Sequence, residues 1–180
     1  MSQEVARRWK LAGILFILLA GSALHFAFAW SGYWRPIGWL AAVNESLWEH
    51  LKLAFWPAVA FALAEYVAFG SHMPRFWAAK GVGIAVMPAV IVGLFYAYTA
   101  ILGESFLPLD IVIFIVAVAL GQYASYRLLF ASHAVGRAAA ILPILLALVF
   151  ILFTYQTPEI GLFRDSPTGG YGILEEYGAH

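Results

Sequence analysis

Long uninterrupted runs of apolar residues dominate the pattern of this chain. Five runs are long enough to cross a membrane as helices, because a hydrocarbon core of about 30 Å needs about 20 helical residues. We expect spans at about 9–30, 46–69, 81–102, 107–130 and 138–155. No alternating strand pattern is visible, and backbone groups in lipid must be hydrogen-bonded within the chain. The predicted fold is therefore all-α: a polytopic membrane protein built as a five-transmembrane-helix bundle.

The composition agrees with a protein whose solvent is partly lipid. Of 180 residues, 63% are hydrophobic and 11% are charged, whereas a soluble domain is about 45–50% apolar and about 25% charged. The lipid bilayer is thus the first expected partner. The net charge is zero, so no field that would attract nucleic acid is expected. The absence of cysteine excludes disulfides, thiolate catalysis and cysteine-ligated metal sites.

The chain divides at the end of the last apolar run. Residues 1–155 form the predicted transmembrane domain, and residues 156–180 form a polar tail rich in proline and glycine. The tail also carries apolar side chains, among them Phe163, Tyr171 and Ile173, which a solvated segment would not need. We expect the tail to fold back as an extracytoplasmic cap over one end of the bundle.

Positively charged residues are distributed unevenly between the two sides of the predicted bundle. One side receives seven of them: Arg7, Arg8, Lys10, Arg75, Lys80, Arg127 and Arg137. The other side receives three: Arg35, Lys52 and Arg164. Cytoplasmic loops carry the excess of lysine and arginine. This pattern predicts a multi-pass protein of the cytoplasmic (inner) membrane, with its N-terminus in the cytoplasm and its C-terminus outside.

Three prolines, Pro57, Pro88 and Pro143, fall inside predicted spans. A proline inside a helix removes a backbone donor and can kink the helix. Bent packing and a hinge for transport both remain open as explanations.

Polar chemistry is most concentrated in the stretch Asn44–Lys52, where the second span begins. Ser46 and Glu49 match a capping box, in which each side chain accepts a hydrogen bond from the other residue's backbone amide. This structural explanation covers Ser46 and Glu49 but leaves Glu45 and His50 unexplained.

A functional explanation assigns the same stretch to a metal site. Glu45, Glu49 and His50 are predicted as catalytic residues, and together with His25 they are predicted as ligands of a divalent metal such as zinc. His25 lies in the outer third of the first span, where an ionisable group is costly and usually faces the bundle interior. Three acidic residues from the same side are candidates to close the site: Asp110, Glu159 and Asp165.

A second polar site is expected near the opposite side of the membrane. Glu65 and Arg127 lie at similar depths in their spans. Because a buried carboxylate needs a partner, we predict a structural Glu65–Arg127 pair, with a proton relay as the functional alternative.

Two segments resemble a known family. The chain is similar there to an uncharacterised family of small prokaryotic integral membrane proteins. The first segment is Asn44-Glu45-Ser46-Leu47-Trp48-Glu49-His50-Leu51-Lys52. The second lies in the tail and contains Phe163-Arg164-Asp165 and Thr168-Gly169-Gly170-Tyr171-Gly172-Ile173. The resemblance implies a prokaryotic cytoplasmic-membrane protein and implies no activity or cofactor.

Three functions remain open from the sequence. The first is an outward-facing polar site that binds a divalent metal and hydrolyses or modifies a lipid or envelope substrate. The second is a small transporter or channel, which needs a continuous polar path across the bundle. The third is a non-catalytic assembly or sensor subunit, in which the motif only shapes a docking surface. Whether the protein is an enzyme is left open, and its protein partners are unknown.

Overall fold

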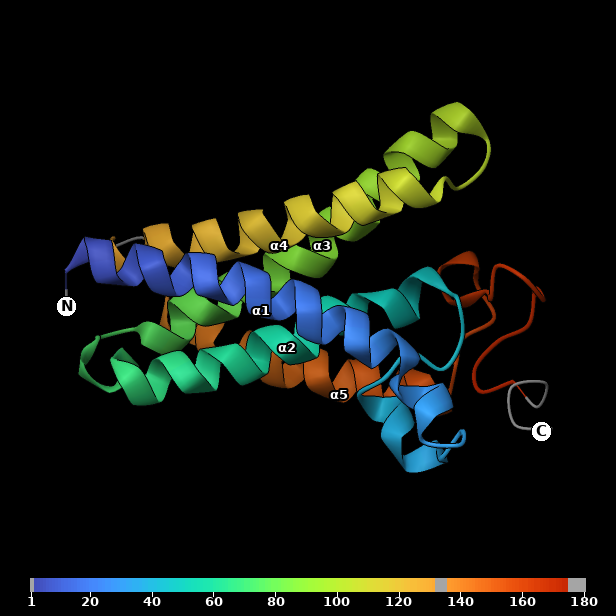
Figure 1. The fold of residues 1–180 in the computed structure, drawn as a ribbon, viewed down its shortest axis with the longest axis horizontal. Helices are drawn as coiled ribbons and strands as arrows, with labels where there is room; N and C mark the ends of the chain where they lie inside the picture. The colour runs from blue at the N-terminus through green and yellow to red at the C-terminus, as the bar shows by residue number, and fades with distance from the viewer. Residues whose placement is uncertain (1, 132–135, 175–180) are drawn as a thin grey trace.

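The computed structural model describes residues 2–131 and 136–174, and Figure 1 shows them as a bundle of long helices. The α-helices are α1 (Gln3–Trp30), α2 (Leu47–Ala68), α3 (Phe76–Leu102), α4 (Leu107–Phe130) and α5 (Leu142–Tyr155). Short 3-10 turns lie between and after them: η1 (Arg35–Trp39), η2 (Gly70–His72), η3 (Arg137–Ile141) and η4 (Gly161–Phe163). Within the described ranges there is no β-strand, only an isolated bridge between Arg164 and Tyr171. The structure is all-α, as predicted.

Among the described residues, five helical segments are long and apolar enough to cross a membrane, and the fifth joins η3 to α5. The predicted 107–130 span coincides with α4, whereas α1 and α3 begin earlier than predicted. Counting apolar residues leaves out charged residues that are still helical, so the predicted starts of these two helices fall several residues too late. Pro57 and Pro88 lie inside helices, but Pro143 lies in the first turn of α5. Proline is favoured there, and Pro143 still lies inside the fifth candidate span, Arg137–Tyr155, as predicted.

Helix α2 is the most buried of the five and lies at the centre of the bundle. Glycines let its neighbours approach closely: a Cβ on Gly21 of α1 would collide with the Leu53 carbonyl of α2. Gly83 of α3 and Gly121 of α4 make an equally close contact with each other. The central apolar core includes residues from every helix: Ile17, Ala54, Phe55, Ala58, Ala62, Ile84, Met87, Ala117, Val118 and Phe150.

The end of the bundle near the N-terminus holds a buried charge cluster. Glu65 of α2 is fully buried, and its carboxylate contacts the ammonium groups of Lys10 and Lys80. Lys10 Nζ lies 2.7 Å from Glu65 Oε1 and donates to Ser125 Oγ at 3.3 Å.

The predicted Glu65–Arg127 pair was wrong. Arg127 lies on the exposed face of α4 and donates to Tyr123 Oη at 2.8 Å. Lys10 was counted only among the basic residues of the cytoplasmic side, but α1 starts at Gln3, so Lys10 lies in its second turn, and its ammonium group contacts Glu65 of α2.

The helices alternate in direction, so the start of α1 and residues 156–174 lie at opposite ends of the bundle (Figure 1). The loop between α1 and α2, the α3–α4 turn and residues 156–174 share one end. Every sequence-predicted ligand comes from this end.

Candidate metal centre

The first turn of α2 sets the positions of the motif side chains. Ser46 is the N-cap, with extended backbone angles, and its Oγ accepts from Glu49 N at 3.3 Å. The reciprocal half of the predicted capping box does not form. Glu49 Oε2 accepts instead from Val43 N at 2.9 Å, and Ser46 N donates to Asn44 Oδ1 at 2.9 Å.

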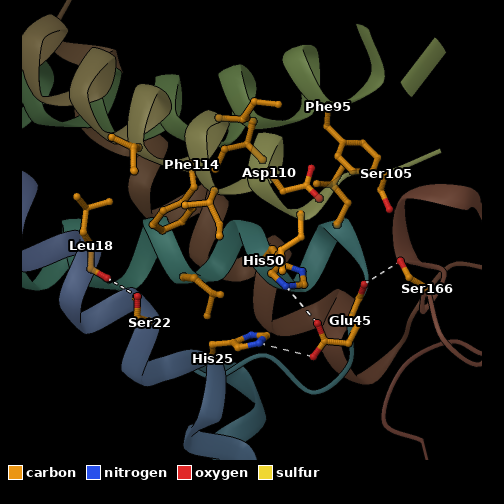
Figure 2. Close-up of a pocket in the computed structure, with 18 of the residues that line it drawn as sticks. Leu18, Ser22, His25, Glu45, His50, Phe95, Ser105, Asp110, Phe114 and Ser166 are labelled. Atoms are coloured by element: carbon orange, nitrogen blue, oxygen red, sulfur yellow. Dashed lines mark hydrogen bonds and ion pairs between the residues drawn. The ribbon is translucent and has the colours of Figure 1, made fainter. Parts of the chain in front are cut away.

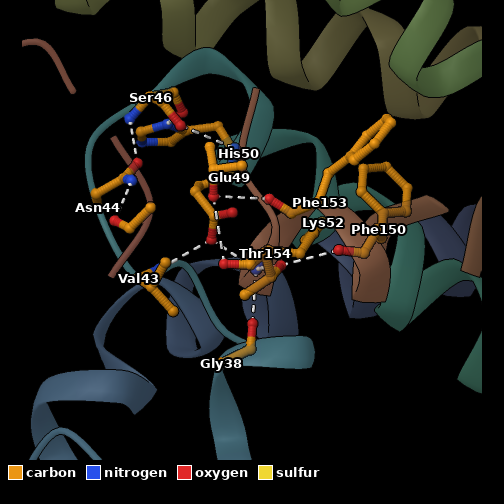
Figure 3. A network of polar contacts seen from close by, with 12 residues as sticks. Gly38, Val43, Asn44, Ser46, Glu49, His50, Lys52, Phe150, Phe153 and Thr154 are labelled. Carbon is orange, nitrogen blue, oxygen red and sulfur yellow. Dashed lines mark hydrogen bonds and ion pairs between the residues drawn. The ribbon is translucent and has the colours of Figure 1, made fainter. Parts of the chain in front are cut away.

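Glu49 and Lys52 form a buried ion pair that joins three elements (Figure 3). Lys52 is fully buried, and its Nζ lies 2.5 Å from Glu49 Oε2. The same ammonium donates to Gly38 O of η1 at 2.6 Å and to Thr154 Oγ1 of α5 at 3.0 Å. Glu49 was predicted as both a catalytic residue and a metal ligand. The structure brings it to this structural network and not to the cluster around His50.

Residues from the tail hold the loop in front of α2. Asn44 Nδ2 donates to Gly172 O at 2.8 Å, and Glu45 N donates to Asp165 Oδ1 at 2.7 Å. Ser166 Oγ donates to Glu45 O at 3.2 Å. Asp165, predicted to close the site, is buried and contacts the backbone of Glu45. The predicted cap extends to residue 180, and residues 175–180 lie outside the described residues.

His25, Glu45 and His50 converge from three segments of the chain (Figure 2). One ligand atom from each lies within 4.8 Å of the other two. Glu45 lies between the two imidazoles: Oε1 is 3.8 Å from His25 Nε2, and Oε2 is 3.4 Å from His50 Nε2. The rings of His25 and His50 are 5.3 Å apart at their centroids. All three side chains are partly exposed, so a solute can reach them.

A backbone carbonyl orients the His50 ring. His50 Nδ1 lies 2.8 Å from Ser46 O, and a carbonyl oxygen can only accept, so Nδ1 carries the hydrogen. Nε2 is then the nitrogen that faces Glu45, with a lone pair for a metal or a proton for the carboxylate. A histidine that binds a metal usually donates its other N–H in this way. The hydrogen bond from His50 lowers the pKa of Glu45, against the opposing effect of burial. Glu45 is thus a carboxylate at neutral pH.

His25 supplies an unsatisfied polar atom beside the cluster. Its Nδ1 is buried and makes no hydrogen bond to the described residues. Its Nε2 is 3.8 Å from Glu45 Oε1, which is longer than a hydrogen bond. A buried polar atom without a partner calls for an explanation, such as a water or an ion.

The cluster opens into a cavity of about 760 Å³ between the helices. Asp110 of α4, predicted to close the site, lines this cavity. Asp110 Oδ1 accepts from Tyr98 Oη at 2.5 Å, and Tyr98 Oη accepts from Phe106 N at 3.0 Å. Glu159 is not brought to the cluster: it lines a separate cavity of about 260 Å³.

Sequence reasoning missed two residues of the site, Tyr98 and Ser166. Tyr98 lies 12 positions before Asp110, across a short turn between two antiparallel helices, and that hairpin spacing was the available signal. Ser166 follows Asp165 in the tail and lines the cavity. No local pattern distinguished it from other loop serines.

A family model described as "Family of unknown function (DUF6512)" matches residues 1–173. This match confirms the resemblance to an uncharacterised family, while the prokaryotic origin stays a prediction. No curated protein and no solved structure matches the chain.

Proposed function

Since the chain belongs to this family of unknown function, we propose from the geometry of its site that it is an integral membrane protein with a divalent-metal centre at His25, Glu45 and His50. The observation that carries the proposal is the meeting of two imidazoles and one carboxylate at the mouth of a cavity. We further propose that this end of the bundle faces outward from the cytoplasmic membrane. The excess of lysine and arginine at the opposite side supports that orientation.

The ligand set favours zinc and a catalytic role. Structural zinc sites use four protein ligands, whereas catalytic ones use three and keep the fourth position for water or substrate. Two histidines and one glutamate form such a three-ligand set. A bound zinc would lower the pKa of a coordinated water to about 7.

The reaction class that fits is hydrolysis of an ester in a lipid or envelope substrate. The oxygen of water bonds to the acyl or phosphoryl centre, the bond to the alkoxy group breaks, and the water proton moves to the departing oxygen. Glu45 serves as a ligand and Glu49 is paired with Lys52, so Asp110 is the carboxylate in the cavity that can take and return this proton. Tyr98 holds Asp110 in place through Oδ1.

A transport function receives less support. A polar path would have to link the cluster to Glu65, but α2 places buried apolar side chains between them: Ala54, Phe55, Ala58 and Ala62. These residues pack against the other helices in the central core. We therefore propose a site at one end of the bundle and not a passage through it.

Metal content of the purified protein tests the proposal. The protein is incubated with zinc, freed of excess ion without chelators, and measured by mass spectrometry. We expect about one zinc per chain in the wild type, and its loss in His25→Ala and in His50→Ala. His72→Ala is the matched control, because His72 is exposed in η2 at the other end of the bundle. A wild type without zinc, or equal loss in the His72→Ala control, would contradict the proposal and leave an assembly or sensor role.

A further inference from the structure

We infer that the substrate of this site is a membrane lipid whose acyl chain enters sideways from the bilayer, between α1 and α4, with its polar head at His25, Glu45 and His50. This inference rests on the proposed function and names the substrate class.

The first observation is the separation of polar and apolar residues along the cavity. Polar side chains gather at the end near the tail: His25, Glu45, His50, Ser105, Asp110 and Ser166. Deeper positions on the same helices are mostly apolar: Leu18 of α1, Leu53 of α2, Ile91 of α3 and Phe114 of α4. Ser22 of α1 also lines this part, and its hydroxyl donates to Leu18 O of the same helix at 2.8 Å. Leu18 and His25 are seven residues apart, which is about 10 Å along a helix. The cavity therefore continues from the cluster into the depth at which the helices are surrounded by hydrocarbon.

The second observation is that the wall of the cavity reaches the lipid-facing surface of the bundle. Phe26 of α1 and Leu107, Ile111 and Ile115 of α4 line the cavity and are also exposed. Leu107 is 69% exposed and Ile111 is 53% exposed. In Figure 1, α3 and α4 extend away from α1 and α2 at this end. The cavity is thus bordered by side chains that contact acyl chains in a membrane.

These two features select one kind of occupant. A water-soluble substrate would leave the apolar depth of the cavity wet, and a plain hydrocarbon would leave the polar cluster unused. A membrane lipid has both parts in the required order, with ester groups near the interface and acyl chains below it. The cavity volume lies within the range of 300–1,000 Å³ that is usual for ligand sites.

Photochemical labelling with a lipid tests the inference. The protein is placed in phosphatidylcholine vesicles that include a phosphatidylcholine with a diazirine on its acyl chain. The vesicles are irradiated, and the labelled positions of the protein are mapped by mass spectrometry. We expect labels concentrated on the cavity-lining positions of α1 and α4, such as Leu18 and Phe114. Leu107→Trp at the cavity mouth should lower this labelling about tenfold, the scale expected when a bulky side chain takes the space that a ligand needs.

Ile144→Trp is the matched control, because Ile144 of α5 is 60% exposed, between the values of Leu107 and Ile111, and does not line the cavity. Ile111→Trp provides a second mouth variant. Labelling spread evenly over all exposed helix faces, or unchanged in both mouth variants, would overturn the inference. Zinc content is measured on the same samples, so the two ideas can fail separately. Cavity labelling that persists in a His25→Ala protein without zinc supports lipid entry even if metal chemistry is absent.

Discussion

Replacing Glu65 by glutamine should be the most damaging single change at the inner charge cluster. Glu65 is fully buried and is the carboxylate that both Lys10 and Lys80 contact. Glu65→Gln leaves two buried ammonium groups without that carboxylate, and removing one partner of a buried pair costs about 3–5 kcal/mol. For a chain of this length, that loss corresponds to a fall in Tm of roughly 6–20 °C.

Removal of one lysine should cost less than removal of the carboxylate. Lys10→Met loses the hydrogen bonds to Glu65 and Ser125 but leaves Glu65 paired with Lys80, so we expect a loss of about 1.5 kcal/mol. Arg127→Gln is the control, since Arg127 is exposed and binds only Tyr123 among the contacts that the structure records. Its effect should stay within about 0.5 kcal/mol.

Thermal unfolding of the detergent-solubilised protein, followed by circular dichroism, ranks these variants. The expected order of destabilisation is Glu65→Gln, then Lys10→Met, then Arg127→Gln. A triple variant, Glu65→Leu with Lys10→Met and Lys80→Met, should recover most of the lost stability, because apolar replacement of a whole buried charge group is often neutral. An Arg127→Gln protein as unstable as Glu65→Gln, or a Glu65→Gln protein with wild-type Tm, would show that the Glu65 carboxylate does not stabilise the two buried lysines.

Two further predictions concern the outer end. Lys52→Met leaves the buried Glu49 carboxylate without its ammonium partner, so it should lower the free energy of unfolding by about 3–5 kcal/mol in the same unfolding assay. The folded variant should still bind zinc. Loss of zinc with an unchanged Tm would contradict this prediction. Asp165→Asn places an amide NH₂ where the carboxylate now accepts from Glu45 N or Thr168 N, at a cost of about 1.5–3 kcal/mol. Backbone hydrogen exchange should accelerate at Glu45 and at residues 165–170 and not at η2; equal exchange in both proteins would count against the tail contacts.

Apolar runs predicted the helices because membrane spanning demands length and hydrophobicity, and both can be counted. The same reasoning placed His25 at the depth of Glu45 and His50, and the structure brings these three together. Depth follows from position along a helix at about 1.5 Å per residue.

Direction around the helix axis was harder to predict. Glu49 and His50 are adjacent, so their side chains point about 100° apart. His50 faces the cavity, whereas Glu49 faces η1 and α5, where Lys52 binds it. Which of the two sectors faces a neighbour depends on how α5 and the tail pack, and the sequence of α2 alone does not contain that information.

The inner cluster shows the same limit at a helix start. Glu65 was correctly expected to need a cationic partner, but Lys10 and Lys80 were counted only among the basic residues of the cytoplasmic side. Both belong to helices that begin several residues earlier than their apolar runs. Charged residues in the first turns of a helix can therefore be core residues when a neighbouring helix offers a carboxylate.

In the proposed function, His25, Glu45 and His50 bind one metal ion together. Diffraction data collected at the zinc absorption edge, from crystals grown with zinc and without chelators, test it most directly. We expect one anomalous peak about 2.0–2.2 Å from a nitrogen of each histidine and an oxygen of Glu45. A map without a peak among these three side chains, or with its main peak at Glu159 or another surface acid, would contradict it.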